Sequence, residues 1–482
     1  MARVVVVSNR VAVPNRDGAM RAGGLEVVLR SFLKRNQGVW FGWSGRLVAK
    51  GDEQVRELKH SDVTYITTDI CRGDFQEYYN GFANRMLWPI LHYRLDLSEF
   101  SSREMAGYLR VNEMFADRLQ AFLKPDDVIW VHDYHFLPLA KALRERGVEN
   151  RIGFFLHIPF PPPDLLTALP KHERTILSLC HYDLVGFQTE NDANNLADYL
   201  TDECRMPSRD RRTFIAGTRT MRIGVFPVGV EMAEFERLAR RMAKVTTVRD
   251  VVTSLADRSM IIGVDRLDYS KGIGMRMRAF EQFLTGYPRW RGSVTYLQIT
   301  PRSRSDIREY AEMERRIDET VGRVNGHYGE AAWTPIRYVN RPYGRSTLAG
   351  LFRSSRAALV TPLRDGMNLV AKEYVTTRLD GDGVLVLSEF AGAADELTEA
   401  VLVNPHDYGA LRDAIVTAVE MNRHERRARM TRLREDVRAS DVQTWADPDH
   451  ETPHEINTRW GGRGVYFPDP VGHNMEIFTR AP

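Results

Sequence analysis

Short apolar runs recur along this chain, and stretches with a helical pattern separate them. Examples are residues 4–7 (VVVV) and 128–131 (VIWV) in the first half and 260–264 (MIIGV) and 357–360 (AALV) in the second. Apolar runs of this kind, bounded by polar or glycine-containing turns, are typical of strands that are buried on both faces. Because helices alternate with them, we expect an α/β fold with parallel sheets covered by helices.

The length of the chain indicates two such sheets. The 482 residues exceed what one hydrophobic core usually contains. A polar segment at residues 240–258 shows little order of its own and is expected to be the crossing point. We therefore expect Rossmann-like domains at 1–243 and 244–446, facing one another across a cleft, and an atypical Pro-, Gly- and His-rich tail at 447–482. Neither half contains G-x-G-x-x-G, so a dinucleotide site has no support.

Composition excludes several classes of protein. The 67 basic and 64 acidic residues nearly balance, which argues against non-specific nucleic-acid binding. The three cysteines are far apart and lack metal-binding spacing, which favours a reduced, cytoplasmic protein. No apolar run is long enough to span a membrane, and no signal peptide precedes the first strand.

Residues 361–374 (TPLRDGMNLVAKEY) are the strongest candidate for a ligand site. They follow the apolar run 357–360 and lead into a helix expected to begin near Asn368. Ligands of open α/β sheets bind beyond the carboxyl ends of strands, and the free N–H groups of a helix start attract anions. The backbone from Gly366 to Val370 would face such an anion, and Glu373 could reach another part of the same ligand. A sugar joined to a diphosphate fits this arrangement.

Other polar side chains also follow apolar runs. Arg10 is the first cation after residues 4–7, and its position favours a role in a site. Asp133, with His132 and His135, fits no zinc pattern and more closely suggests a loop that lines a cleft. From the sequence alone, a core histidine is about as good an explanation of His157 as a site residue. Arg266 and Lys271 could be surface charges, but their position after a strand favours a site.

Many separated motifs of this chain resemble those of one family. The motifs are residues 5–10 (VVVSNR), 22–25 (AGGL), 40–45 (WFGWSG), 77–80 (EYYN), 87–89 (LWP), 92–94 (HYR), 108–112 (YLRVN), 130–135 (WVHDYH), 155–161 (FLHIPFP), 186–189 (GFQT), 265–272 (DRLDYSKG) and 361–374. From residue 3 to about 446, the chain resembles trehalose-6-phosphate synthases, which are retaining glycosyltransferases of GT-B fold. The resemblance implies transfer of glucose from UDP-glucose to glucose-6-phosphate, giving α,α-trehalose-6-phosphate, by a protein that is a homo-oligomer (dimer or tetramer).

The same resemblance assigns roles to individual residues. The acceptor phosphate is expected at Arg10, Tyr79 and Arg304, and the acceptor sugar at Trp88 and Asp133. On the donor side, Arg266 and Lys271 are expected on the diphosphate, with Gly24 nearby. The remaining donor contacts are expected from His157, Asp365, Gly366, Met367, Asn368, Leu369, Val370 and Glu373. We take Arg266, Lys271, Asp133, His157 and Asp365 as the catalytic set.

The chemistry needs positive charge where the leaving diphosphate develops negative charge. Arg266, Lys271 and the helix start at Asn368 can supply it, so we expect no metal and no other cofactor. A carboxylate nucleophile, as in retaining glycosidases, would have to be Asp365 or Glu373. The family assigns both to binding, and we expect front-face substitution instead.

Three further segments carry weaker expectations. Residues 380–384 (DGDGV) are similar to metal-binding and phosphatase motifs, but they precede an apolar run and are expected to be a polar turn; no phosphatase domain follows. The basic stretch 423–438 is expected to be a solvated helical face. The tail segment 464–477 resembles the closing hairpin of glyoxalase-like proteins, in which Glu476 would ligate a metal, but about 37 residues cannot build that fold.

Two alternatives to this function stay open. A sister transferase would use another phosphorylated acceptor, such as glycerol-3-phosphate, or a GDP-sugar. A catalytically silent regulatory homologue would bind sugar phosphates without turnover, but it should have lost one of the catalytic residues, and all are present.

Overall fold

The computed structural model describes residues 3–14, 29, 33, 38–302 and 308–440, and the backbone of two short strands near the C-terminus. The chain divides into two compact units, Met1–Pro227 with Gln443–Pro482, and Val228–Val442. This division comes at Val228 rather than at residue 244, and α9 (Met232–Arg240) packs on α13 (Arg345–Ser354) and α14 (Leu369–Thr377) within the second unit.

The first unit is built on a nine-stranded sheet with the order β3-β4-β2-β1-β5-β6-β7-β9-β8. Its strands are β1 (Val4–Arg10), β2 (Val39–Val48), β3 (Val55–His60), β4 (Val63–Cys71), β5 (Val128–His132), β6 (Arg151–Phe155), β7 (Leu184–Phe187), β8 (Thr213–Ala216) and β9 (Arg219–Val225). The apolar runs of the sequence form its parallel centre. The expected parallel sheet is thereby confirmed, and only the edge strands β3 and β8 pair antiparallel, with β4 and β9.

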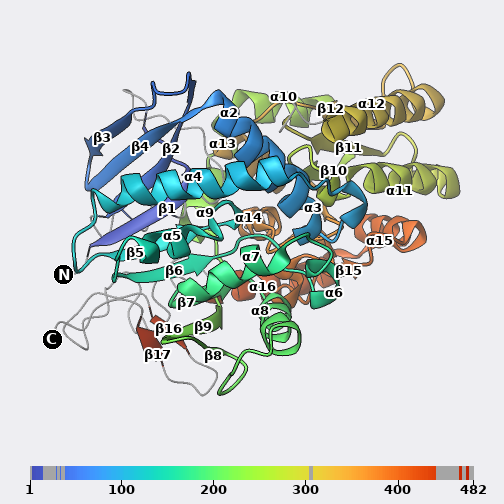
Figure 1. Ribbon diagram of the computed structural model, residues 1–482. Helices are drawn as coiled ribbons and strands as arrows, with labels where there is room; N and C mark the ends of the chain where they lie inside the picture. The colour runs from blue at the N-terminus through green and yellow to red at the C-terminus, as the bar shows by residue number, and fades with distance from the viewer. Residues whose placement is uncertain are drawn as a thin grey trace. The chain divides into compact units, whose positions relative to one another are not determined.

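Helices cover both faces of this sheet. They are α2 (Arg72–Phe75), η1 (Gln76–Leu87), α3 (Trp88–Leu91), η2 (Leu95–Leu97), α4 (Ser102–Gln120), η3 (Tyr134–Phe136), α5 (Leu139–Glu145), α6 (Pro163–Leu166), α7 (His172–Ile176), η4 (Leu177–His181), α8 (Glu190–Asp198) and η5 (Tyr199–Glu203). Figure 1 shows the long helix α4 running along the sheet, where it packs on η1 and α5. Ser101 caps α4 by accepting from the N–H of Glu104, and Val111, Phe115 and Leu119 line its buried side.

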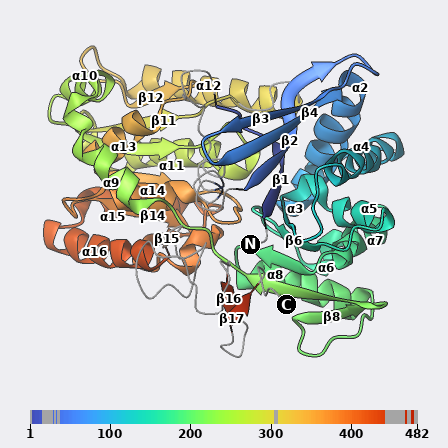
Figure 2. The ribbon, with the colours of Figure 1, turned by 90° about the vertical axis from the view of Figure 1, so that its left-hand side faces the viewer.

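The second unit has a wholly parallel six-stranded sheet with the order β12-β11-β10-β13-β14-β15. The strands are β10 (Ser259–Val264), β11 (Val294–Ile299), β12 (Ile336–Val339), β13 (Ala357–Val360), β14 (Val384–Ser388) and β15 (Val401–Val403). In Figure 1, α11 (Ile273–Gly286), α12 (Arg308–Tyr328) and α15 (Tyr408–Glu420) lie along one side of this sheet. The helices α9, α13 and α14 contact one another on its other side (Figure 2). The shorter helical segments are η6 (Met242–Lys244), η7 (Tyr269–Lys271), η8 (Pro288–Trp290) and η9 (Gly392–Asp395).

One expectation for the second unit is wrong, and another holds only in part. Residues 240–258 are not a low-order crossing, because η6 and α10 (Thr246–Leu255) occupy most of them and Val248 and Leu255 are buried. The basic stretch 423–438 lies in α16 (Arg423–Ala439), and Arg423, Arg427, Arg432 and Arg438 are exposed, as expected for a solvated face, but two arginines depart from this expectation. Arg426 is buried against Asp382, and Arg434 donates to Glu236 of α9.

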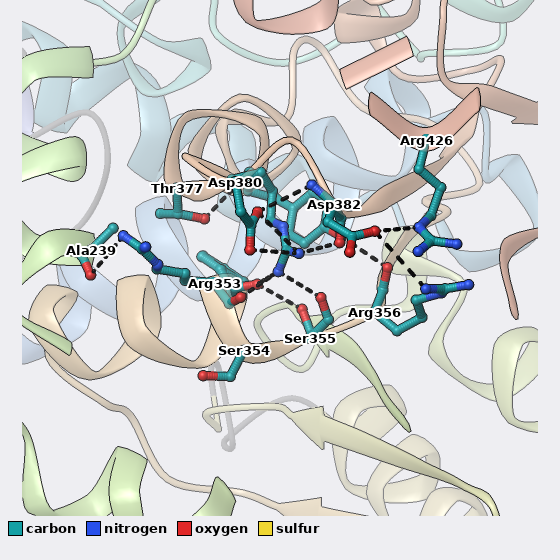
Figure 3. A network of polar contacts seen from close by, with 12 residues as sticks. Ala239, Arg353, Ser354, Ser355, Arg356, Thr377, Asp380, Asp382 and Arg426 are labelled. Atoms are coloured by element: carbon teal, nitrogen blue, oxygen red, sulfur yellow. Dashed lines mark hydrogen bonds and ion pairs between the residues drawn. The ribbon is translucent and has the colours of Figure 1, made fainter. Parts of the chain in front are cut away.

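The turn at residues 380–383 is the polar turn that the sequence predicts. It precedes β14, and arginines surround it: Arg426 Nε donates to Asp382 Oδ1 at 2.5 Å, and Arg356 Nη1 lies 4.0 Å from the same oxygen (Figure 3). Arg378 contacts the turn through an ion pair with Asp380 and a hydrogen bond that it donates to the carbonyl of Asp382. Its acids are thus fully engaged in holding the fold.

Near the C-terminus, β16 (Tyr466–Pro468) and β17 (Asn474–Glu476) pair antiparallel. This is the geometry of a hairpin, but the resemblance to glyoxalase-like proteins stays a prediction. Among the described residues, no helix has both the length and the apolar character that crossing a membrane requires.

Candidate functional site

In the first unit, the polar candidates gather at one edge of the sheet. Strands β1, β5 and β6 are parallel neighbours, with Val7 paired to Val131 and His132 paired to Phe155. Arg10 ends β1, Asp133 directly follows β5, and His157 comes two residues after β6. Because the carboxyl ends of parallel strands share an edge, side chains distant in sequence come together there.

An aromatic platform supports Arg10. Its guanidinium lies 5.6 Å from the ring centroid of Trp43, an arrangement that favours a cation through the ring's electron-rich face. Gly45, at a φ of +85°, leaves room for this guanidinium, because a Cβ at position 45 would lie only 2.8 Å from Nη2 of Arg10. Trp43 also contacts Tyr79, at 6.4 Å between ring centroids. The two residues expected at the acceptor phosphate, Arg10 and Tyr79, therefore share Trp43, which the sequence analysis did not assign to the site.

The same ring system continues to the residue expected at the acceptor sugar. Tyr79 stacks on His135 with an interplanar angle of 8°, and His135 contacts Tyr134 at 4.1 Å between centroids. Tyr134 in turn contacts Trp88, which is buried. Tyr79 and Trp88 thus lie on one continuous aromatic surface.

Asp133 has an unusual backbone conformation. Its φ of 78° and ψ of 164° fall in a region that glycine occupies almost alone. Two backbone bonds hold it there: its N–H donates to the carbonyl of Phe155, and its carbonyl accepts from Phe136. Strain of this kind is concentrated at functional sites, which agrees with the role expected of Asp133.

His157 is half-buried and lies in a polar pair rather than in a purely apolar core. Its Nε2 is 2.9 Å from Nδ1 of His132, and its Nδ1 is 3.5 Å from Nε2 of Gln188. Burial lowers the pKa of His157 to about 3, and burial together with the neighbouring His157 lowers the pKa of His132 well below its ordinary value. Both imidazoles are therefore neutral at physiological pH.

In the second unit, a lysine and a carboxylate from different loops meet. Lys271 Nζ donates to Asp365 Oδ2 at 2.5 Å, and Nδ2 of Asn368 donates to the same oxygen at 3.0 Å. Asn368 also caps α14, because its Oδ1 accepts from the N–H of Ala371. The predicted helix start is confirmed, and Leu369 and Val370 occupy its first turn, where N–H groups favour an anion.

Buried polar contacts hold the loop that carries Arg266 and Lys271 in place. Asp265 pairs with the fully buried Arg276 at 2.5 Å, and Asp268 accepts from both the N–H and the hydroxyl of Ser270. The N–H of Leu363 donates to the carbonyl of Ser270 at 2.6 Å, which ties the loop to residues 361–370. Arg266 itself is exposed. The sequence does not reveal that Arg276 holds this loop, because the helical pattern of α11 identifies its buried apolar residues but not a buried arginine.

Glu373 lies half-buried on α14, within the helix that Asn368 caps. Burial raises its pKa to about 7, and the positive charge of Arg345 only partly opposes this shift. A carboxyl group in this state is partly protonated near neutral pH and can donate as well as accept a hydrogen bond.

Two expected site residues, Gly24 and Arg304, lie outside the described part of the chain. Gly366 and Met367 lie in the loop before Asn368, as expected, and Met367 is buried. Within the described residues, no group of three or more His, Cys, Asp or Glu side chains could hold a metal ion.

The model of Glycosyltransferase family 20 matches residues 2–451. The chain belongs to glycosyltransferase family 20. A trehalose-6-phosphate synthase from Sinorhizobium fredii is 50% identical over 450 residues, which are 92% of this chain and 97% of that protein.

Solved structures agree with this assignment. An α,α-trehalose-phosphate synthase (UDP-forming) from Burkholderia xenovorans, in complex with glucose-6-phosphate, has a TM-score of 0.88 at 43% identity, over 92% of this chain and 98% of that one. A trehalose-6-phosphate protein from E. coli bound with UDP-2-fluoro glucose has a TM-score of 0.86 at 43% identity, over 92% and 97% of the two chains. The two-domain α/β fold expected for glycosyltransferase family 20 is thereby confirmed, and all expected site residues fall within the matched range.

Proposed function

We propose that this member of glycosyltransferase family 20 transfers glucose from UDP-glucose to glucose-6-phosphate, with retention, to give α,α-trehalose-6-phosphate and UDP. The observation that carries the proposal is the meeting of Lys271, Asp365 and Asn368 at the start of α14. A cation, an oriented carboxylate and free helix N–H groups at one point suit a diphosphate joined to a sugar. The relatives support the same substrates, since one was solved with glucose-6-phosphate and another with UDP-2-fluoro glucose.

On the donor side, Arg266 and Lys271 neutralise the diphosphate, and the backbone from Gly366 to Val370 completes its seat. Asp365 and His157 contact the transferred glucose, Glu373 the ribose, and Gly24 lies near the phosphates. On the acceptor side, Arg10, Tyr79 and Arg304 hold the phosphate of glucose-6-phosphate, and Trp88 and Asp133 hold its sugar. The support from geometry is the shared platform of Trp43 under Arg10 and Tyr79.

The reaction proceeds on one face of the donor sugar. The bond between the anomeric carbon and the β-phosphate oxygen breaks, and the anomeric hydroxyl of the acceptor forms the new bond on the same face. That hydroxyl gives its proton to the departing phosphate oxygen, whose developing charge Arg266 and Lys271 stabilise.

Neither candidate carboxyl group suits a covalent route. Asp365 Oδ2 accepts hydrogen bonds from a lysine and an amide, which stabilise its negative charge and lower its nucleophilicity. The pKa of Glu373, raised to about 7, leaves that carboxyl only partly ionised near pH 7. A glucosyl adduct on either residue, seen by mass spectrometry, would exclude front-face substitution.

We further propose that the enzyme needs no metal, because fixed cations and helix dipoles supply the charge that a metal would. We expect it to act in the cytoplasm as a homo-oligomer, a dimer or a tetramer.

The decisive test measures UDP release from UDP-glucose, with and without glucose-6-phosphate and in the presence of EDTA, with NMR of the product. We expect release that depends on the acceptor and an α,α-1,1 linkage. Activity only with GDP-glucose or glycerol-3-phosphate would indicate the sister transferase instead. Binding of glucose-6-phosphate without turnover of any of these donors would indicate the regulatory homologue.

A further inference from the structure

The pair formed by His132 and His157 has a feature that packing does not explain. His132 ends β5 and is fully buried, yet its Nε2 has no hydrogen-bond partner among the described residues. Leaving a buried polar atom unpartnered is costly, and such atoms in a folded protein call for a reason. An apolar side chain of similar shape would avoid this cost. The other nitrogen, Nδ1, makes the one contact with His157.

The contact between the two rings contains a single proton. Both imidazoles are neutral, so each ring carries one N–H and one acceptor nitrogen. At 2.9 Å, His132 Nδ1 and His157 Nε2 must be one donor and one acceptor. The tautomers of the two rings are therefore coupled, and the environment of one decides the tautomer of the other.

The neighbour on the far side of His157, Gln188, favours one of the two arrangements. Nδ1 of His157 faces the amide nitrogen of Gln188, which has protons to donate and no lone pair to offer. At 3.5 Å this contact is long and only favours Nδ1 as the acceptor, whereas the 2.9 Å bond in which His157 Nε2 donates to His132 Nδ1 holds the proton on Nε2. The loop that carries His157 is held separately, because Phe160 N donates to Asp192 and Asn195 donates to the carbonyl of Phe160.

We propose that His132 is a positioning residue that fixes the ring of His157 with the proton on Nε2 and an unprotonated Nδ1 directed away from the pair. Since His157 contacts the transferred sugar, a hydroxyl of that sugar displaces the long contact with Gln188 and donates its hydrogen to the single lone pair of Nδ1. The proposal rests on the proposed function for the part that concerns the sugar, whereas the tautomer is a property of the free protein. It explains why a histidine with an unpartnered buried nitrogen occupies the end of β5.

The tautomer can be measured without any substrate. Protonated and unprotonated imidazole nitrogens have well-separated 15N chemical shifts, and the signals of His157 are assigned by their loss in His157→Gln. We expect a protonated Nε2 and an unprotonated Nδ1 in the wild type, and a mixture of tautomers in His132→Phe. A protonated Nδ1 in the wild type, or an unchanged tautomer in His132→Phe, would overturn the proposal whether or not the transferase assay succeeds.

Activity and stability give the second readout. His132→Phe should lower kcat/KM for UDP-glucose about 10- to 100-fold while its thermal midpoint stays at or above that of the wild type. His132→Asn places an amide oxygen near the position of Nδ1 and should restore most of the activity. The matched control is His181→Phe, which removes a half-buried histidine bonded only to the carbonyl of Ser178 among the described contacts and should leave kcat/KM unchanged.

A structural role would produce a different pattern. In that case His132→Phe would lower the thermal midpoint, and His132→Asn would fail to restore activity. Either result, or full activity in His132→Phe, would contradict the positioning role.

Discussion

Two turns of the second unit both begin with Asp-Gly but lie at opposite ends of neighbouring strands. Residues 365–368 (DGMN) follow β13, whereas residues 380–383 (DGDG) precede β14, and β13 and β14 are paired in parallel. In the first turn Asp365 is engaged by Lys271 and Asn368, and a half-buried Glu373 with a raised pKa lies just beyond. In the second, arginines satisfy both acids (Figure 3).

The difference shows that position relative to the strand decides what an acidic turn can do. At the carboxyl end of a strand, the turn leads into a helix whose N–H groups are free for a ligand. At the amino end of a strand no helix start is presented, and here Asp382 instead ties α16 to the sheet, while Asp380 pairs with Arg378. We expect the first turn to determine activity and the second to determine stability.

The largest effect should come from Asp365→Asn. This change keeps the shape of the side chain but removes the charge that orients Lys271 at the diphosphate. We expect kcat/KM to fall about 10²- to 10³-fold, with a smaller loss of thermal stability than the same substitution at Asp382. Steady-state kinetics and thermal denaturation of the two variants check this contrast. Wild-type activity in Asp365→Asn would contradict the assignment of the donor site to this turn.

The counterpart, Asp382→Asn, should affect stability alone. Burial would raise the pKa of Asp382, but the guanidinium of Arg426 outweighs it, and the net pKa lies below its ordinary value. Neutralising this carboxylate leaves Arg426 buried without its charged partner, at a cost of about 1–3 kcal/mol.

Urea denaturation measures that loss, and kcat/KM of the folded enzyme should stay unchanged. A loss of activity without a loss of stability would mean that the two turns do not divide their roles as proposed.

The sequence predicted the central strands of the first sheet and missed its edge strands β3 and β8. The central strands are apolar runs buried on both faces, whereas β3 and β8 are edge strands in which exposed residues such as Leu58 and Ile215 interrupt any clear pattern. The helix α10 was missed because Thr246, Thr247 and the valines that follow have low helix propensity, which the packing of Val248 and Leu255 overrides.

For the site, motifs indicated the residues but not their partners. The contact of Lys271 with Asp365 joins residues 94 positions apart, and no spacing rule predicts it. The pattern of α16 does not distinguish Arg426 and Arg434 from its exposed arginines, because their partners Asp382 and Glu236 are remote in sequence. His132 belongs to the motif at residues 130–135, but its contact with His157 depends on the pairing of β5 with β6, which the motif does not reveal.

The contribution of Glu373, which lies just beyond the first turn, to the free energy of unfolding should depend on pH. The pKa of Glu373 is about 7 in the folded protein and near 4.5 when exposed. The folded state therefore holds a proton that the unfolded state releases between these values, and the free energy of unfolding falls as pH rises from about 4.5 to 7.

Compared with Glu373→Gln, which does not titrate, the wild type should lose about 2–3 kcal/mol across this window. Urea denaturation of both proteins at several pH values measures the difference. Parallel pH profiles would show that Glu373 is already ionised in the folded protein, and its expected contact with the ribose would then be that of a carboxylate.

The smallest effect concerns one backbone position in each turn. Asn368 has a φ of 84° and Gly381 a φ of 65°, a region that glycine and asparagine tolerate better than other residues. Asn368→Ala loses both the cap of α14 and this tolerance, so we expect it to lower the free energy of unfolding by about 2 kcal/mol.

Asn368→Gly removes the cap of α14 but keeps a residue that tolerates a positive φ. Gly381→Asn also places a residue that tolerates a positive φ, and its Cβ would lie 3.5 Å from the nearest side-chain atom, which is an ordinary contact. Both should change stability by less than about 1 kcal/mol. In thermal denaturation of the three variants, only Asn368→Ala should therefore have a clearly lowered thermal midpoint. If Asn368→Gly is as unstable as Asn368→Ala, the cap and the bond to Asp365, rather than the backbone conformation, require asparagine at this position.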